Sequence, residues 1–550
     1  MSSAISKQVY EDLIEAKKSG NEGFLEILHL WRTQVFWVHG KVEKEIEFLS
    51  KQIAFIITIL SAYLLEKHEY SLSKAGKNPF SSSLSGLIDE FIADDDRFMP
   101  YLSLVRYVLF DGDVGSNESI RGKYITIIRN NLERVRIFCD KTVIDPISPI
   151  YQIMFSSSDK HAAGEHYTPA DLCNLMNTKL EPIVDARILD PCCGVGAFLV
   201  TTYRNVLSKS KNQEKNPDKF KINGWDINPI AILGARANMW NIMGKKEFKI
   251  TDFFKTIRIN NILDIKQESF DIIVGNPPWV TLKDFSNRTF QRTALATAKE
   301  LKISPDAHDV PQLELATIVF SIAVKRLLVE NGKIFFIMTS SFLNGKHCNR
   351  FRNFYWLTNI EIWQFPSSHI FPRAFACVYG EKINNPLGIF STTEQIRAIT
   401  WNTSSSSTKN GRNYTFKKEN TEILVPTNLN KIIQANKKDE ELGIAKLIPA
   451  KSAKNLLICK FTSPYKSICY NGATIFPQIL LFVDIIGIDE ERNTVSVRPE
   501  PNLNSKKPWH IPAYDTSLVE RKHVFDLVKG SELYPFGLLK PWKVFLPIMR

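Results

Sequence analysis

From Arg187 to Lys382 the chain alternates short apolar runs with amphipathic stretches of helical length. Such alternation specifies a mainly parallel sheet with helices on both faces, and ligands of these sheets bind at the carboxyl ends of the strands. We therefore predict an α/β, doubly wound, Rossmann-like fold. The predicted strands are Ile188–Asp190, Ile222–Ile227, Phe248–Phe254, Phe270–Asn276, Lys333–Thr339, Ile360–Phe365 and Cys377–Lys382, and the predicted helices include Ala197–Leu207, Pro229–Met243 and Pro311–Glu330.

The regions on either side of this alternation have a different texture. Before residue 150 the apolar residues recur at helical spacing, as in Phe24, Leu28 and Trp31, which predicts an all-helical domain over 1–150. The alternating domain is predicted over 151–384. In the remainder, 385–550, the alternation fades and we predict a mixed α/β basic domain. Its polar stretch Ser404–Asn413 is interpreted as a solvated loop.

The length and the net charge of the chain indicate its number of domains and its class of partner. A chain of 550 residues suggests roughly three or four domains at about 150 residues each. Its formal charge of +12 favours polyanionic partners, with nucleic acid first, although a soluble basic surface gives the same excess. The basic excess is concentrated after residue 380, where 24 lysines and arginines face 16 acidic residues.

The cysteines and the apolar stretches indicate an intracellular protein without a membrane span. None of the 8 cysteines forms a C-x-x-C pair, so we expect a reducing, cytoplasmic location and no structural metal. The longest apolar stretch, Ile53–Leu65, is well short of the ~20 residues that cross a bilayer. It is interpreted as a buried helix.

A glycine pair separates the first predicted strand from the helix after it. The sequence there runs Asp190-Pro191-Cys192-Cys193-Gly194-Val195-Gly196-Ala197-Phe198. Two glycines at this place let the backbone turn tightly and let a ligand approach closely. With the Asp190 carboxylate at the strand end, the pattern favours a nucleotide-type pocket over a plain tight turn.

Acidic residues lie near the carboxyl ends of the next two predicted strands. Asp226 ends the second strand, where a carboxylate can accept both hydroxyl hydrogens of a ribose or cap the helix that begins at Pro229. Asp252 and Phe253 place a polar acceptor beside an aromatic surface, which suits an adenine amine and ring.

The fourth predicted strand runs into Asn276-Pro277-Pro278-Trp279. The two prolines deny further sheet pairing and fix the direction of the chain. The side chain of Asn276, the carbonyl of Pro277 and the face of Trp279 are then expected at the sheet edge. The alternative is a rigid turn capped by a packed tryptophan.

Taken in order, these segments resemble the motif series of the gamma order of amino-methylating, adenine-specific DNA methyltransferases. The series begins with Gly164-Glu165-His166-Tyr167-Thr168-Pro169 and covers about residues 150–382. The chain departs from the family pattern at Cys192-Cys193, Val195 and Trp279, without loss of a needed functional group.

The resemblance implies S-adenosyl-L-methionine as the cofactor of a Rossmann-like methyltransferase domain. It assigns the amino-acid end of the cofactor to Asp190, the ribose to Asp226, and the adenine to Asp252 with Phe253. The remaining implied cofactor-binding residues are Tyr167, Thr168, Pro169, Cys192, Gly194 and Gly196.

The resemblance also implies a mechanism on a flipped-out adenine of duplex DNA. The Asn276 side-chain oxygen and the Pro277 carbonyl would accept hydrogen bonds from the N6 amine and make its lone pair available, with Pro278 stiffening the turn. Trp279 would stack on the base. Phe371 matches a second stacking aromatic, and core packing explains it nearly as well.

The last third occupies the place of a DNA target-recognition region, and a separate specificity or nuclease subunit is an expected partner in a restriction or defence system. Lys346, Arg350 and Arg352 suit either phosphate contacts or a solvated helix face. The alternative functions are an RNA or protein-glutamine methyltransferase and a non-catalytic DNA-binding subunit.

Overall fold

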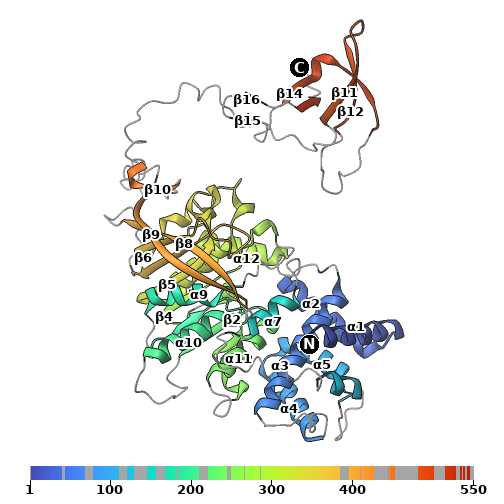
Figure 1. Cartoon of the computed structure of the whole chain (residues 1–550), viewed down its shortest axis with the longest axis vertical. Helices are drawn as coiled ribbons and strands as arrows, with labels where there is room; N and C mark the ends of the chain where they lie inside the picture. Colours follow the sequence, from blue (N-terminus) through green and yellow to red (C-terminus); the bar gives the residue numbers. More distant parts are fainter. Residues whose placement is uncertain are drawn as a thin grey trace. The chain divides into compact units, whose positions relative to one another are not determined.

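The computed structural model divides the chain into two compact units, Met1–Ile458 and Cys459–Arg550, which we describe separately (Figure 1). The structure describes residues 2–39, 42, 44–67, 78–110, 120–128, 145, 147–155, 167–181, 185–209, 221–243, 249–265, 267–284, 287–384, 395–408, 411–426, 444, 446–452, 481–500, 514–527, 533–534, 537–538 and 542–545.

The described part of the amino-terminal region is helical, as predicted. Its long helices are α1 (Ser2–Ser19), α2 (Glu22–His39), α3 (Glu45–Lys67), α4 (Asn78–Asp94) and α5 (Met99–Leu109), followed by α7 (Ile147–Met154). The apolar stretch Ile53–Leu65 lies in α3, which packs against α1, α5 and α11. Among the described residues one stretch, Glu45–Leu65, is long and apolar enough to cross a membrane, and 83% of its most apolar window is buried inside the protein.

The predicted parallel sheet is present and is extended on one side. Its strand order is β10-β9-β8-β6-β7-β5-β4-β1-β2-β3. The central strands are β1 (Ile188–Asp190), β2 (Ile222–Asp226), β3 (Ile257–Ile259), β4 (Phe270–Gly275) and β5 (Leu328–Thr339), all parallel, and β7 (Phe375–Lys382) enters antiparallel between β5 and β6 (Leu357–Gln364). The fold class expected from the alternation is therefore confirmed.

The order of the strands creates a crevice between β1 and β4. From β1 the chain proceeds outward to β2 and β3, whereas from β4 it proceeds in the opposite direction to β5. Because crossovers between parallel strands are right-handed, the two directions place their helices on opposite faces. Helices α9 (Ala170–Leu180), α10 (Ala197–Lys209) and α11 (Pro229–Met243) pack in one series, while α12 (Arg288–Glu300) packs with α13 (Leu315–Ile322). The carboxyl edge at β1 and β4 is the expected ligand site.

The predicted strand Phe248–Phe254 is wrong in the part that the structure describes. Residues 250–253 form a 3₁₀ turn, because the carboxylate of Asp252 accepts the backbone N–H of Lys249 at 2.7 Å and closes the chain on itself. The strand of the sheet, β3, begins later, at Ile257. The predicted helix Pro311–Glu330 is also shorter, since α13 passes through a π-helical turn at Ala323–Leu327 into β5.

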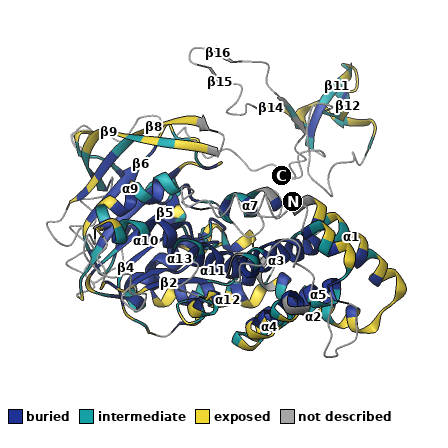
Figure 2. Cartoon of the chain, turned by 60° about the horizontal axis from the view of Figure 1, so that its bottom comes forward, coloured by how far each residue is buried: buried dark blue, intermediate teal, exposed yellow. Residues whose placement is uncertain are grey.

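Beyond β6 the sheet continues with strands that the alternation did not indicate. They are β8 (Ile396–Thr408), β9 (Gly411–Pro426) and β10 (Leu447–Pro449). Strand β8 pairs in parallel with β6, so the compact unit extends past the boundary predicted at residue 384. The solvated loop expected over 404–413 is wrong for its described residues, which belong to β8 and β9 and pair with one another. Figure 2 shows the central strands buried and much of β8 and β9 exposed.

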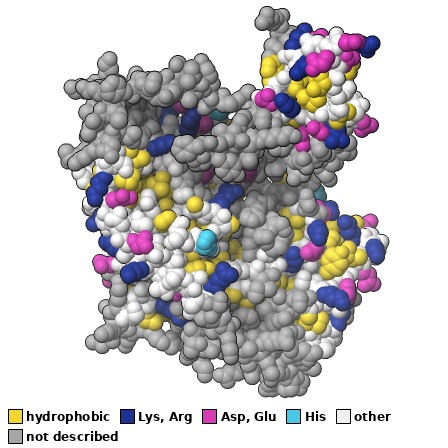
Figure 3. Space-filling model, turned by 45° about the horizontal axis from the view of Figure 1, so that its top comes forward, with side chains coloured by type: hydrophobic (Ala, Val, Ile, Leu, Met, Phe, Trp, Pro, Cys, Tyr) yellow, Lys and Arg dark blue, Asp and Glu magenta, His cyan; other side chains and the backbone are white. Residues whose placement is uncertain are grey.

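The second unit contains a five-stranded sheet in the order β13-β12-β11-β17-β14. The strands are β11 (Phe482–Asp489), β12 (Thr494–Pro499), β13 (Ser517–Glu520), β14 (Val524–Leu527) and β17 (Trp542–Phe545), and a short hairpin of β15 (Leu533–Tyr534) and β16 (Gly537–Leu538) stands apart. Its described buried core is the small cluster Val483, Val495 and Val497. Figure 3 shows hydrophobic side chains at its surface, and the exposed ones include Ile486, Ile488 and Leu518.

Candidate active site

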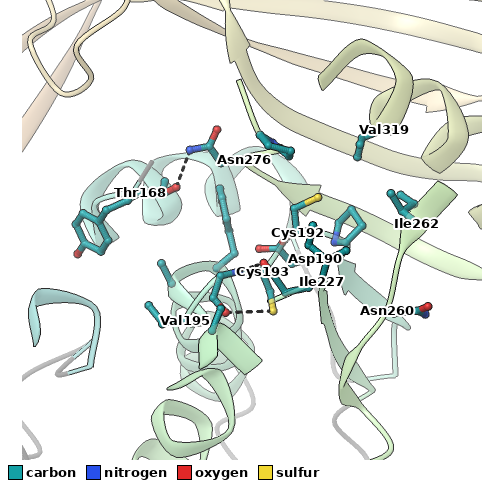
Figure 4. Close-up of a pocket in the computed structure, with 18 of the residues that line it drawn as sticks. Thr168, Asp190, Cys192, Cys193, Val195, Ile227, Asn260, Ile262, Asn276 and Val319 are labelled. Atoms are coloured by element: carbon teal, nitrogen blue, oxygen red, sulfur yellow. Dashed lines mark hydrogen bonds between the residues drawn. The ribbon is translucent and has the colours of Figure 1, made fainter. Parts of the chain in front are cut away.

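A cavity opens at the carboxyl edge of the sheet, at the crevice between β1 and β4 (Figure 4). Its walls come from the segments that follow β1, β2, β3 and β4, from the segment before α9, and from helices α7, α12 and α13. The sequence-predicted residues that line it are Tyr167, Thr168, Asp190, Cys192, Gly194, Asp226, Asn276 and Pro278. Those that are not among its lining residues are Pro169, Gly196, Asp252, Phe253, Pro277, Trp279 and Phe371. Gly164–His166 lie outside the described residues.

The two glycines of the turn after β1 have different tasks. Both adopt left-handed backbone conformations, with φ of +52° at Gly194 and +92° at Gly196, where a side chain is strained. A Cβ on Gly194 would meet nothing within 4 Å, so this position leaves open space on the cavity side. A Cβ on Gly196 would lie 3.4 Å from Ala235, so this position allows α10 to approach α11.

Asp190 places a buried carboxyl group at the floor of the cavity. Its side chain lies at the end of β1, is 1% exposed, and accepts the backbone N–H of Cys192 at 3.1 Å. Burial raises the pKa of Asp190 well above its usual range, and the nearby charge of Asp226 raises it further, against the opposing effect of the Cys192 hydrogen bond. A cationic ligand group would favour the ionised form.

Asp226 holds the turn from the other side. One carboxylate oxygen accepts the backbone N–H of Gly194 and the other accepts that of Asn228, both at 2.9 Å. The side chain therefore fixes the glycine turn and the start of α11 together. The carboxylate also lines the cavity, where it can accept hydrogen bonds from the hydroxyl groups of a ligand.

The end of β3, rather than the turn at Asp252, supplies the next part of the wall. Asn260, Asn261, Ile262 and Leu263 follow β3 and line the cavity. Asn261 caps the short turn after it by accepting the N–H of Leu263 at 3.2 Å, and Figure 4 shows Asn260 at the end of the cavity away from Asn276. Sequence reasoning missed these residues because it placed the third strand too early. The alternating Ile257-Arg258-Ile259 followed by two asparagines was the available signal.

Helix α7 adds a wall that sequence reasoning also missed. Ser148, Tyr151 and Gln152 line the cavity from this helix, and the Tyr151 hydroxyl accepts a hydrogen bond from the Asn228 side chain at 3.2 Å. The ring of Tyr151 packs on Phe55 of α3 with centroids 5.5 Å apart. Helix α7 of the helical region therefore forms part of the cavity wall. No local sequence motif indicates this contact.

Asn276 stands at the cavity wall directly after β4. Its side-chain nitrogen donates to the hydroxyl of Thr168 at 3.2 Å, which joins the segment before α9 to the turn after β4 (Figure 4). This hydrogen bond to the Thr168 hydroxyl orients the Asn276 amide at the cavity wall.

The two aromatic residues predicted to stack on a base lie against each other. Trp279 is 2% exposed and Phe371 is 7% exposed, and their rings meet edge to face with centroids 4.9 Å apart. Phe371 also packs edge to face on Phe375 at 4.9 Å. Stacking a base between Trp279 and Phe371 requires the two rings to separate.

A buried carboxylate ties the turn after β4 to the end of β5. Glu314 accepts hydrogen bonds at 2.5 Å from the hydroxyls of Thr339 and Ser341, and its backbone neighbour Leu315 donates to the carbonyl of Val280. Burial opposes ionisation of Glu314, but these hydroxyls and the nearby ring of His347 outweigh it and hold its pKa below the usual range.

The residues that follow β5 bear on two predictions from the sequence, a phosphate-contact role for Arg352 and the absence of a metal. Arg352, one of the basic residues considered for phosphate contacts, is fully buried and donates to the carbonyls of Phe342, Gly345 and Ile444, so its role is structural. Within the described segments, Glu314, His347 and Cys348 bring possible metal-ligand atoms within 4.8 Å of one another. The expectation that the protein has no metal stays a prediction.

Residues 143–350 match the family described as N-6 DNA Methylase. The type II methyltransferase M.VspI from Vibrio sp. (strain 343) is 24% identical over 199 residues, which are 36% of this chain and 42% of that protein. The type I restriction enzyme MjaVII methylase subunit from Methanocaldococcus jannaschii is 28% identical over 140 residues, 24% of this chain and 22% of that protein.

Among solved structures, the type I restriction-modification system methyltransferase subunit from Streptococcus thermophilus superposes with a TM-score of 0.38 and 14% identity, covering 80% of this chain and 86% of that chain. The chain aligns with less than half the length of the two curated relatives named above. Its matched segment nevertheless contains β1 to β5 and the cavity motifs from Tyr167 to Asn276. Residues 143–350 are therefore similar to the N-6 DNA Methylase family, and the resemblance of the sequence motifs to adenine-specific DNA methyltransferases is confirmed.

Proposed function

We propose that this protein transfers a methyl group from S-adenosyl-L-methionine to the N6 amine of an adenine flipped out of duplex DNA, within a restriction-modification or defence system. The observation that carries the proposal is the position of Asn276 on the wall of the same cavity that holds Asp190, Asp226 and the open side of Gly194. The family match of residues 143–350 supports the reaction class.

The residues of the cavity fit the proposed cofactor. Gly194 provides a place where a ligand can touch the backbone, because a Cβ there would occupy otherwise open space. The Asp190 carboxyl group suits the amino group of the cofactor's amino-acid end, and the Asp226 carboxylate on the cavity wall suits ribose hydroxyls. We replace Asp252 with Asn260 and Asn261 as the polar groups nearest the adenine end, since both line the cavity. When bound, the sulfonium supplies an activated methyl group.

The chain's own contribution to the reaction is orientation of the target amine. The Asn276 amide is oriented by its bond to Thr168, and the Pro277 carbonyl follows it in a segment that prolines hold out of the sheet. Two oxygens that accept hydrogen bonds from an adenine amine would localise its lone pair and align it for attack. Trp279, which ends this turn, and Phe371, which packs on it, are the proposed stacking surfaces, and their rings would separate to receive the base.

Partners follow from the same proposal. Duplex DNA is the substrate, and residues 385–550 with their basic excess are proposed to contribute to target recognition. A separate specificity or nuclease subunit is a proposed partner, because the chain matches methylase subunits of type I enzymes over part of their length. We propose a cytoplasmic location and no membrane association, in keeping with DNA as the substrate.

The test is methyl transfer from labelled cofactor to unmethylated duplex DNA, RNA and protein, assayed side by side. We expect label in DNA as N6-methyladenine. Asn276→Ala should reduce the rate by about 100-fold or more, the loss typical of removing one hydrogen-bonding group that acts on the transition state. The matched control, Asn174→Ala in α9 away from the cavity lining, should retain the wild-type rate. Label in RNA or protein alone, or none in any substrate, would reject the DNA methyltransferase in favour of the two alternatives named above.

A further inference from the structure

The hairpin of β8 and β9 extends beyond the carboxyl edge of the sheet. Strand β8 pairs with β6 only as far as the pair Gln364 and Thr400, and continues to Thr408 with β9 as its paired strand. Strands β5 and β6 are both antiparallel to β7, so they run in the same direction, and β4 is parallel to β5. Strand β6 therefore runs parallel to β4. The overhanging part therefore leaves the sheet at the edge where Asn276 lies. We call residues 401–408 and 411–418 the ribbon.

One face of the ribbon is attached to the protein. The ring of Phe416 packs edge to face on Phe365 with centroids 5.8 Å apart. Near the tip, the backbone N–H of Tyr414 donates to the carboxylate of Asp171 at 2.8 Å, at the start of α9. Asp171 follows shortly after Tyr167 and Thr168, which line the cavity. The ribbon is thus held in a fixed place beside the cavity wall.

The opposite face carries polar side chains directed to solvent. Residues directly opposite each other in an antiparallel pair share a face, and the outward pairs are Asn402 with Lys417, Ser404 with Thr415, and Ser406 with Asn413. All six are exposed (Figure 2). Asn402 also bonds to Glu419 at 2.9 Å and contacts Ser367, so it anchors the base of this face.

The charge of the ribbon has one sign. Between Trp401 and Lys418 the sequence contains no aspartate or glutamate, and the first carboxylate beyond the ribbon is Glu419. Lys417 lies on the outward face, whereas Arg412 and Lys418 share the face of Phe416. A solvated edge of a sheet commonly mixes both signs, so the absence of carboxylates is informative. Amide, hydroxyl and ammonium groups are the side chains that contact phosphates and base edges of DNA.

We propose that the ribbon is a DNA-contacting surface, whose outward face lies against the phosphates and a groove of the duplex beside the flipped adenine. A two-stranded β-ribbon is of the size that the major groove admits. The proposal rests on the proposed function and adds which surface of the chain holds the duplex. It assigns this contact to the first compact unit, independently of the second.

The test measures binding of a labelled, unmethylated duplex to the full chain and to two ribbon variants. Thr415→Asp places a carboxylate in the middle of the outward face, and we expect about tenfold weaker binding or worse. Lys417→Gln removes one cation, and the slope of log affinity against log salt should fall by about 0.9, the value for one phosphate contact. Thr33→Asp, the same substitution on an exposed position of α2, should bind like wild type.

Cofactor affinity without DNA is measured for each variant and should stay at the wild-type value, which shows that the cavity is intact. If the wild-type chain binds duplex DNA and both ribbon variants bind it within about twofold of wild type at low salt, the ribbon contact is rejected while the proposed reaction stands. If the wild-type chain binds no duplex, the proposed function fails and the ribbon contact fails with it.

Discussion

The two ends of the ten-stranded sheet differ in the length and the burial of their strands. At the β3 end the strands are short, with three residues in β1 and in β3. They are buried by the helices that connect them and by helices of the amino-terminal region. At the other end β8 and β9 are 13 and 16 residues long and much of their length is exposed. The loops that follow the short buried strands meet at one edge of the sheet and form the cavity. The long strands β8 and β9 instead present their side chains to solvent.

The packing at the β3 end depends on a buried arginine. Arg236 of α11 is 1% exposed, forms an ion pair with Asp94 of α4 at 2.8 Å, and donates to the carbonyl of Ile257 at 2.7 Å. Its guanidinium lies over the ring of Phe254 at 4.3 Å. One side chain thus joins the helical region, α11 and β3.

The largest predicted effect breaks this junction. Arg236→Ala leaves Asp94 without its buried partner and opens space among aromatic rings, so we expect a loss of about 3–5 kcal/mol in the free energy of unfolding. At the other end of the sheet, Arg397→Ala removes a guanidinium that is 53% exposed from its pair with Glu361, and we expect under about 1 kcal/mol.

Urea unfolding followed by circular dichroism measures both variants. Glu361 keeps Lys179 at 3.5 Å and the Trp363 ring N–H at 2.6 Å, which is the reason for the small effect of Arg397→Ala. Equal losses in the two variants would contradict the contrast between a buried and an exposed end.

The next prediction compares one substitution in two strands. A Cβ on Gly275 of β4 would lie 2.7 Å from an oxygen of Asp190, so Gly275→Ala must displace that carboxyl group. We expect cofactor affinity to fall by about tenfold, equivalent to ~1.4 kcal/mol. A Cβ on Gly380 of β7 would meet the methyl carbons of Leu357 at 3.2 Å, a flexible side chain far from the cavity lining. Gly380→Ala should keep its affinity, and isothermal titration of each variant with cofactor decides between the two outcomes.

The sequence was sufficient where local chemistry and tertiary structure agree. Asp190, Gly194, Asp226 and Asn276 lie at or directly after the ends of buried apolar strands, and all four line the cavity. It was insufficient at β3, where Asp252 closes a turn by a hydrogen bond that no apolar pattern reveals.

The other omissions have a different physical cause. Helix α7 reaches the cavity through packing on α3 and α11, which is a contact between segments distant in sequence. The ribbon was interpreted as a loop because serine and asparagine are weak strand formers. Pairing between β8 and β9, together with Phe416 on Phe365, overrides that preference.

The smallest predicted effect concerns the pH dependence of stability that the buried carboxyl group of Asp190 causes. Because the folded protein raises the pKa of Asp190, chiefly by burial, the folded state binds a proton more tightly than the unfolded state. Stability therefore falls as pH rises from the unfolded pKa through the raised folded pKa. Asp190→Asn should raise the thermal midpoint at pH 7, and the gain should vanish in acid, where the wild-type carboxyl is already protonated. The same variant should bind cofactor more weakly at pH 7, since it has lost the charge that faces the cationic amino group. A wild-type midpoint that rises with pH over this range, or an Asp190→Asn variant that binds cofactor as wild type does, would show that this carboxyl group is not held ready for a cation.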